Sequence, residues 1–192
     1  MTFMPAFDLF PQEGAIIGKI VVGYGELELD LAQCLVPLLG DITTMSRVMF
    51  RLRNESNRLA IADAMLKPYY ERLDMAAFYD QAYGTFSRCK QIRNNHAHCH
   101  WTDSNGNLFF TIFEESATQR GNGSDISFYH VDLKLLQAQL ALFENCQDWL
   151  FYLRHEAEAK REKKTQTLCP KPKIMQLPPL YNPPEKAPHF HM

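Results

Sequence analysis

Apolar side chains recur at intervals of three and four residues along four stretches of the chain, and polar side chains occupy most positions between them. This spacing places the apolar residues of each stretch on one face of a helix, so it predicts four amphipathic helices. The helices are expected at residues 14–39, from a cap at Asp41 or Thr43 to Pro68, from Asp74 to about His100, and from Asp132 to about residue 164. We therefore expect a mainly α-helical protein.

The first predicted helix is unusually rich in glycine, at positions 14, 18, 23 and 25. Each glycine costs about 1 kcal/mol of helix propensity relative to alanine. Glycine also leaves room for a neighbouring backbone, because it has no Cβ atom. The density of glycines therefore indicates that another helix approaches this one closely.

Two short segments break the helical pattern. Residues 108–113 and 126–131 are rich in aromatic and β-branched side chains, which favours strands, and a turn signal at 103–107 precedes the first of them. We expect the two strands to form a β-hairpin at about residues 106–131. The predicted fold is thus mainly α, a four-to-five-helix up-and-down bundle with a small β-hairpin insertion.

Length and composition predict one domain with appendages. A chain of 192 residues with 46% hydrophobic content can bury one sizeable core. We assign residues 1–10 to an N-terminal extension, 11–160 to the helical domain and 161–192 to a basic, proline-rich, disordered tail. Residues 160–192 carry seven basic and two acidic side chains, a net +5, which leaves −7 for the rest of a chain whose total is −2.

The five cysteines are an odd number without the spacing of a disulfide framework, and the first ten residues lack the pattern of a signal peptide. These features predict a cytoplasmic protein, since that compartment keeps thiols reduced. No apolar run approaches the length of a transmembrane helix, so we expect a soluble protein without a membrane span.

The richest chemistry of the chain lies in residues 91–101, Gln-Ile-Arg-Asn-Asn-His-Ala-His-Cys-His-Trp. At 100° per residue, Arg93, His96 and His100 continue the apolar face of the third predicted helix. An apolar face that ends in polar side chains is typical of a site built on a bundle helix, where the apolar part fixes the helix and the polar part faces a cleft or a second subunit.

Arg93 and Asn94, followed after three residues by His98, resemble the signature of the HEPN superfamily, an arginine, a polar residue, variable residues and a histidine. The signature allows four to six residues between arginine and histidine, so His98 and His100 both fit. The resemblance implies a helical, metal-independent endoribonuclease that needs no cofactor and acts as a homodimer with a shared cleft. It assigns catalysis to Arg93, Asn94 and His98, with His96 and His100 as further candidates for a catalytic or a supporting role.

The chemistry of RNA cleavage agrees with these residue types. Attack of a ribose 2′-hydroxyl on the adjacent phosphate needs proton transfer, which a histidine supplies, and stabilisation of negative charge, which an arginine supplies. Arg47, Arg51 and Arg58 on the second predicted helix are candidate contacts to the RNA backbone. The same arginines are also typical of an ordinary solvated helix surface, because acidic residues are interspersed with them.

The resemblance implies a toxin or a phage-defence nuclease, with an antitoxin or a defence-system protein as its partner. Two alternatives remain at this stage. In the first, the protein is a catalytically inactive HEPN-like interaction module, the histidines cap a helix end, and Arg93 pairs with Glu26 or Glu28. In the second, His96 and His100 bind a metal ion, since two histidines four residues apart on a helix share a face. Cys99 and His98 would be further donors by residue type, but on a continuous helix they point elsewhere.

Overall fold

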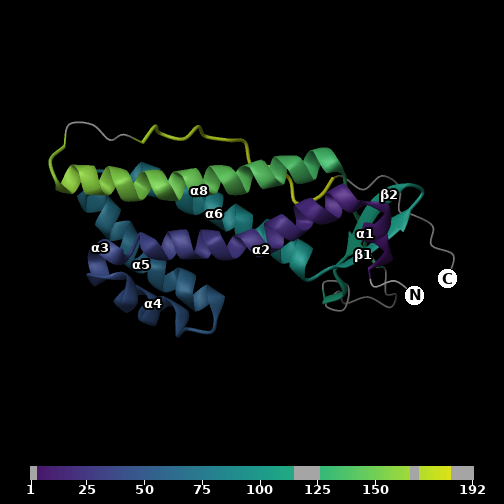
Figure 1. Ribbon diagram of the computed structural model, residues 1–192, viewed down its shortest axis with the longest axis horizontal. Helices are drawn as coiled ribbons and strands as arrows, with labels where there is room; N and C mark the ends of the chain where they lie inside the picture. Colours follow the sequence, from purple (N-terminus) through teal and green to yellow (C-terminus); the bar gives the residue numbers. More distant parts are fainter. Residues whose placement is uncertain (1–3, 115–125, 165–168, 183–192) are drawn as a thin grey trace.

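The computed structural model of the chain describes residues 4–114, 126–164 and 169–182 (Figure 1). These residues form long helices and one small three-stranded antiparallel sheet, which confirms the prediction of a mainly α-helical protein. The elements are α1 (Pro5–Leu9), α2 (Pro11–Gln33), α3 (Val36–Leu39), α4 (Ile42–Phe50), α5 (Glu55–Arg72), α6 (Ala76–Ala97), β1 (His100–Ser104), β2 (Asn107–Thr111), β3 (Tyr129–Val131) and α8 (Leu133–Arg161).

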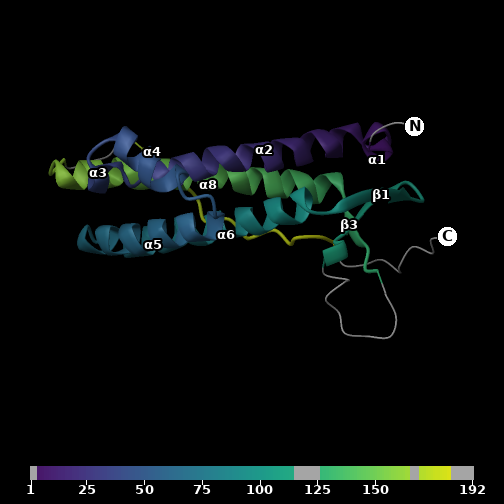
Figure 2. The same cartoon turned by 90° about the horizontal axis from the view of Figure 1, so that it is seen from below.

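Three long helices, α2, α6 and α8, enclose the main core. In Figure 2, α5 and α6 occupy one row and α2 and α8 another, and α6 runs opposite to the other two long helices. Ile20, Phe86 and Leu150, one residue from each of the three helices, are fully buried. Burial of one such side chain contributes about 1.5–3 kcal/mol, so this core fixes the orientation of α6 and of the polar residues near its end.

The second predicted helix is two helices. Asp41 is the N-cap of α4, as predicted, and its carboxylate accepts hydrogen bonds from the amides of Thr43 and Thr44. The helix ends at Phe50, and Asn54 caps a new helix through a hydrogen bond from the amide of Asn57. The apolar spacing does not indicate this break, because apolar residues continue at helical intervals from α4 into α5.

Pro68 does not end a helix, which corrects a second prediction about this region. It lies inside α5, on the exposed side of the helix. The hydrogen bond that a proline removes leaves a carbonyl without its helical donor, and on an exposed face water can supply the missing donor.

The third predicted helix also ends earlier than expected. α6 stops at Ala97, and His100 begins β1. β1 and β2 form a tight hairpin through Asn105 and Gly106, which both have positive φ angles, 50° and 75°. An Asn-Gly pair of this kind is typical of the turn that joins two strands directly. The sequence signal for the turn was correct, but the strand before it was not predicted, and its first residue, His100, was assigned to the end of the helix.

β3 pairs with β2 in the antiparallel register Leu108↔Val131, as the predicted hairpin required. The connecting segment at 115–125 lies outside the described residues. The sheet has the order β1-β2-β3 and packs with α1 at one end of the molecule (Figure 1). Phe7 of α1 contacts Trp101 of β1, with ring centroids 5.5 Å apart, so this part of the N-terminal extension contributes to a second small core.

Of the four glycines of α2, only Gly14 lies close to another helix among the described residues. A Cβ atom at Gly18, Gly23 or Gly25 would meet no heavy atom within 4 Å, and a Cβ atom at Gly14 would meet Phe7 of α1 at 3.0 Å. The predicted close approach of a helix is therefore found at Gly14, where α1 packs, and at none of the other three glycines among the described residues. Sequence pattern alone identifies small residues on a face, but it does not show which part of the chain covers that face.

The region predicted as a disordered tail differs in part from that expectation. Residues 169–182 have no helix and no long strand, as predicted, but they lie in an extended conformation against α6 and α8. The hydrogen bonds that α6 and α8 donate to them go to main-chain carbonyl groups, which analysis of side-chain pattern does not detect. Residues 165–168 and 183–192 lie outside the described residues.

No helix in the described part of the chain combines the length and the apolar character that crossing a membrane requires.

Candidate functional site

The histidine-rich stretch spans the end of α6 and the start of β1, and its three histidines lie in different environments. His96 is buried, with 3% of its surface exposed, whereas His98 and His100 are exposed. His98 is the C-cap of α6, and its backbone amide donates to the carbonyl of Asn94. The ring of His100 lies 4.8 Å from that of Phe113. His98 is thus the histidine with an accessible side chain at the helix end.

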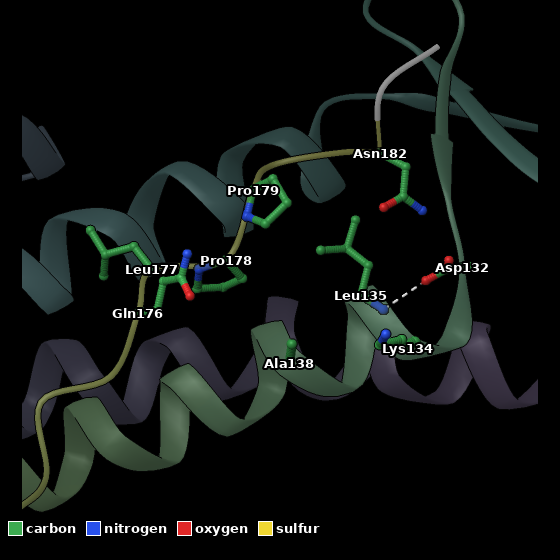
Figure 3. Close-up of a pocket in the computed structure, with 9 residues that line it drawn as sticks. All are labelled: Asp132, Lys134, Leu135, Ala138, Gln176, Leu177, Pro178, Pro179 and Asn182. Atoms are coloured by element: carbon green, nitrogen blue, oxygen red, sulfur yellow. Dashed lines mark hydrogen bonds between the residues drawn. The ribbon is translucent and has the colours of Figure 1, made fainter. Parts of the chain in front are cut away.

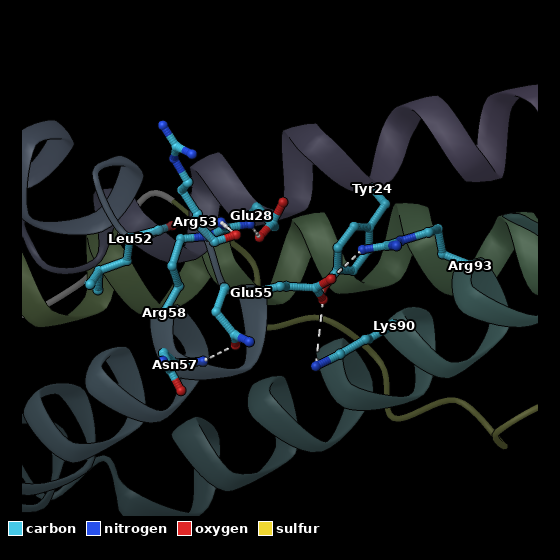
Figure 4. Close-up of polar contacts among 10 residues, drawn as sticks. Tyr24, Glu28, Leu52, Arg53, Glu55, Asn57, Arg58, Lys90 and Arg93 are labelled. Atoms are coloured by element: carbon cyan, nitrogen blue, oxygen red, sulfur yellow. Dashed lines mark hydrogen bonds and ion pairs between the residues drawn. The ribbon is translucent and has the colours of Figure 1, made fainter. Parts of the chain in front are cut away.

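The side chain of Arg93 points into the interface of α6 with α2 and α5 (Figure 4). Its Nη2 donates to Oε2 of Glu55 at 2.6 Å, and its guanidinium carbon lies 4.3 Å from the centre of the Tyr24 ring. The side chains of Arg93 and Glu55 are 17% and 22% exposed. Charge-assisted hydrogen bonds of this length are among the strong ones in proteins, so Arg93 joins α6 to the first turn of α5.

Glu55 is the centre of this cluster. Its Oε1 accepts a hydrogen bond from the hydroxyl of Tyr24 at 2.8 Å, and Nζ of Lys90 lies 3.5 Å from the same oxygen. Burial alone would raise the pKa of Glu55, but the hydrogen bonds from Tyr24 and Arg93 and the charges of Arg93 and Lys90 outweigh burial, so this pKa is lowered. Burial, followed by the hydrogen bond to Glu55, raises the pKa of Tyr24. Tyr24 therefore remains a donor and Glu55 an anion.

A second ion pair lies beside the first. Nη2 of Arg58 donates to Oε1 of Glu28 at 2.6 Å, and its Nη1 donates to the carbonyl of Leu52 at 2.9 Å (Figure 4). Arg58 therefore holds α5 to α2 and satisfies a carbonyl at the break between α4 and α5. Of the three predicted RNA contacts, Arg47 and Arg51 are exposed, whereas Arg58 is engaged within the chain.

His96 is held by Gln139 of α8, with 2.8 Å between Nε2 of the ring and Oε1 of the amide. The amide nitrogen of Gln139 donates to the carbonyls of Pro179 and Leu180 at 2.9 and 3.2 Å. Since that nitrogen is a donor, the amide oxygen must accept, so Nε2 of His96 carries a hydrogen. Burial lowers the pKa of His96, against the opposing effect of the Gln139 hydrogen bond, and keeps the ring neutral.

The state of His96 predicts a dependence of stability on pH. Its pKa is lower in the folded chain than the ordinary value of 6.5, so the unfolded chain binds more protons as the pH falls. The stabilisation is fully present above pH 6.5 and is lost as the pH falls toward the folded-state pKa, by up to about 1.4 kcal/mol per pH unit. Denaturant unfolding between about pH 5 and pH 8 measures this slope, which His96→Gln should reduce and His100→Gln should not. Equal slopes in all three proteins would contradict the assignment.

The predicted metal pair is not formed. His100 lies on β1 and His96 is buried against Gln139, so the two histidines do not share a helical face. Among the residues that the structure describes, no three His, Cys, Asp or Glu side chains gather closely enough to hold a metal ion.

The structure brings Arg93 and Arg58 into one polar cluster, of which His98 is not a member (Figure 4). It also adds Glu55, Lys90 and Tyr24, which sequence analysis did not single out. Arg93 was expected to pair with Glu26 or Glu28, and this prediction was wrong. Arg93 pairs with Glu55, and Glu28 pairs with Arg58. Asn54 before Glu55 is a helix-cap signal, but nothing in the sequence shows that the first turn of α5 meets α6.

Three buried polar atoms around the stretch have no hydrogen-bond partner among the described residues: Nε of Arg93, Oδ1 of Asn94 and Nδ1 of His96. Chemically, the region offers a fixed guanidinium, an ionised carboxylate and the two exposed imidazoles of His98 and His100. These groups can bind an anion or move a proton, provided that the arginine exchanges its carboxylate for the ligand.

Comparisons of the chain with protein-family models, with curated proteins and with solved structures found no match.

Proposed function

We propose that the chain is an HEPN-type, metal-independent endoribonuclease with the fold of an up-and-down helical bundle. The observation that carries the proposal is the position of the motif. Its histidine, His98, is exposed at the C-cap of α6, and its arginine lies on the same helix with 17% of the side chain exposed. A histidine with an accessible ring can give a proton to the leaving group of the cleavage reaction.

In this proposal, Arg93 stabilises the charge of the cleaved phosphate and Asn94 orients it. Glu55 holds the guanidinium in one place before RNA binds, and a phosphate oxygen then takes over part of the hydrogen bonding that Glu55 accepts. Arg47 and Arg51 are exposed and act as contacts to the RNA backbone. The biological role would be that of a toxin or a phage-defence nuclease, with an antitoxin or defence-system protein as partner.

A second candidate function is a catalytically inactive HEPN-like interaction module, and the Arg93–Glu55 pair favours it. Arg93 shares its carboxylate with Lys90 and Tyr24, and Arg58 is paired with Glu28, so two arginines of the predicted site already hold helices together. In such a module the motif would stabilise the chain and would not meet a phosphate.

RNA cleavage by the purified full chain in the presence of a metal chelator decides between these functions. The enzyme should give products that end in a 2′,3′-cyclic phosphate, because the attacking group is the 2′-hydroxyl, and chelation should not slow it. No cleavage of single-stranded or structured RNA, even with protein in excess over RNA, would favour the interaction module. Cleavage that the chelator abolishes would contradict the metal-independent mechanism.

The proposed enzyme is a homodimer in which two copies of the motif line one cleft. The exposed face of α2 supports this part, because Val22 is 79% exposed and a Cβ atom at Gly18 or Gly25 would meet no heavy atom of the chain within 4 Å. Small residues on such a face allow a second copy to approach closely.

Val22→Glu is therefore expected to convert the dimer to a monomer and to reduce RNA cleavage, because two carboxylates would be buried near the two-fold axis. Light scattering at micromolar concentration measures the mass, and Ile42→Glu on α4, 57% exposed, is the matched control that should remain dimeric. A wild-type monomer under these conditions would contradict the shared cleft. A dimer that tolerates Val22→Glu would place the interface elsewhere.

A further inference from the structure

Residues 169–182, which we call the strap, follow α8 in the opposite direction (Figure 1). Asn145 of α8 contacts the strap at Lys173, Gln139 contacts it at Pro179, and His130 of β3 pairs with it at Asn182. The order of these contacts shows that the strap returns along the whole first half of α8 to the sheet.

From Cys169 to Pro178, burial within the strap repeats every third residue. The inward positions are Cys169, Pro172, Met175 and Pro178, and the strap ends in three partly buried residues, Leu180, Tyr181 and Asn182. The positions between them are mostly exposed, with Ile174 at 71% and Leu177 at 48%. A period of three is that of the polyproline II helix, which has no internal hydrogen bonds and leaves its carbonyl groups available. The sequence Pro178-Pro179 within the strap favours this conformation because proline fixes φ.

Side chains of two helices bind these carbonyl groups. Nε and Nη2 of Arg88 on α6 both donate to the carbonyl of Pro178, at 3.0 and 2.6 Å. From α8, Gln139 donates to the carbonyls of Pro179 and Leu180, and Asn145 donates to that of Lys173 at 3.0 Å. Donors on both α6 and α8 therefore hold the strap, and we call the surface of these two helices that it occupies the α6–α8 groove.

An aromatic contact adds to this recognition. Nζ of Lys171 lies 4.5 Å from the centre of the Phe78 ring of α6, a cation–π geometry. Aromatic rings and side-chain donors along a groove are the general means by which proteins bind polyproline II segments.

Cys169, Met175 and Leu180 of the strap pack against the main core, but the strap leaves part of the groove uncovered. A pocket of about 430 Å³ remains between residues 176–182 and the first turns of α8, lined by Leu135 and Ala138 on the helix side (Figure 3). The strap is thus attached through a series of separate contacts, each made by one buried side chain or one carbonyl group. Such an arrangement is that of a bound peptide more than of a packed helix.

We propose that the α6–α8 groove is a binding site for an extended, proline-rich peptide, and that its occupant is the strap sequence, bound in cis and exchangeable with the same segment of a second copy. Arg88, Gln139 and Asn145 of the groove donate hydrogen bonds to carbonyl groups of the peptide backbone. The inward side chains of the peptide pack against the two helices. This inference does not depend on ribonuclease activity. It also connects the groove to the histidine-rich stretch, because Gln139 binds the strap and His96 at once.

The test uses the full chain with residues 165–168 replaced by a protease recognition sequence. After cleavage, the fragment that carries the strap should remain bound to the helical body during size-exclusion chromatography. An excess of a synthetic, fluorescently labelled peptide of residues 169–182 should then replace it, as measured by anisotropy and by loss of the original fragment. Arg88→Ala in the body should weaken peptide binding about tenfold, which corresponds to about 1.4 kcal/mol. Arg72→Ala, an exposed arginine of α5, is the matched control.

Two neighbouring prolines provide a matched pair within the peptide. Pro178 is buried and Pro179 is exposed, and alanine at either position removes one fixed φ angle. Pro178→Ala should therefore weaken competition more than Pro179→Ala does. Release of the fragment upon cleavage, with the body still folded by circular dichroism, would overturn the proposal. A fragment that never exchanges, or a body that unfolds when the fragment leaves, would also overturn it, because the strap would then be part of the core.

Discussion

His98→Ala is expected to lower the rate of RNA cleavage by at least about 100-fold, the usual loss when a group that transfers protons is removed. The same change should leave the melting temperature nearly unaltered, because the His98 side chain is exposed at the end of α6. Initial rates of cleavage for wild type and variant, with chelator present, measure the effect, and thermal unfolding of both proteins verifies that the fold is intact.

His100→Ala is the matched control, since His100 is also exposed and two residues away. An inactive His100→Ala protein beside an active His98→Ala protein would show that the longer motif spacing is the correct one. Equal rates in wild type and both variants would reject the site. Arg93→Ala is a poorer test of catalysis, because it also leaves the Glu55 carboxylate without its 2.6 Å partner and so alters stability.

The main helices could be predicted from sequence because each presents an apolar face of helical period to a shared core. The caps at Asp41 and Asp132 were also predictable, since an aspartate before an apolar run is a strong local signal. The break at residues 51–54 could not be predicted in this way. It depends on Arg58, which reaches back to the carbonyl of Leu52 and at the same time binds Glu28 of α2.

The end of α6 shows a second limit. His100 continues the helical face of Arg93 and His96 when the sequence is drawn as a helix, but the chain leaves the helix after Ala97. The hairpin explains the change, because Asn105-Gly106 requires a strand on each side and β1 must start early enough to pair His100 with Thr111. The end of α6 therefore depends on the pairing of β1 with β2, and the local periodicity of the sequence does not reveal this pairing.

The candidate residues could be found from sequence, but their partners could not. Arg93, Asn94 and the histidines stand in one conspicuous stretch, whereas Glu55 and Gln139 are ordinary helix residues 38 and 43 positions away from the side chains that they bind. Which acidic or amide group meets each of them depends on how α5 and α8 pack on α6.

Glu55→Ala is expected to lower the free energy of unfolding by about 2–3 kcal/mol. The change removes the acceptor for Arg93, Lys90 and Tyr24 together and leaves polar groups in a half-buried interface without partners. For a chain of this length, the loss corresponds to a fall of roughly 5–10 °C in melting temperature. Urea unfolding with a common m value measures the free energy. Glu71→Ala, an exposed position on the same helix, is the control and should change it by less than about 0.5 kcal/mol.

The isosteric variant Glu55→Gln, compared with wild type at several pH values, separates the stabilisation by the carboxylate charge from that by the volume of the side chain. The pKa of Glu55 is lower in the folded chain than its ordinary value of 4.5, so the unfolded chain takes up its proton first as the solution is acidified. The stabilisation from the charge is therefore complete above pH 4.5 and disappears as the pH falls through the folded-state pKa. The difference in unfolding free energy between wild type and Glu55→Gln should be constant from about pH 7 to pH 5 and should shrink below that range. A difference that persists unchanged in acid would mean that Glu55 stabilises the helix interface through packing alone.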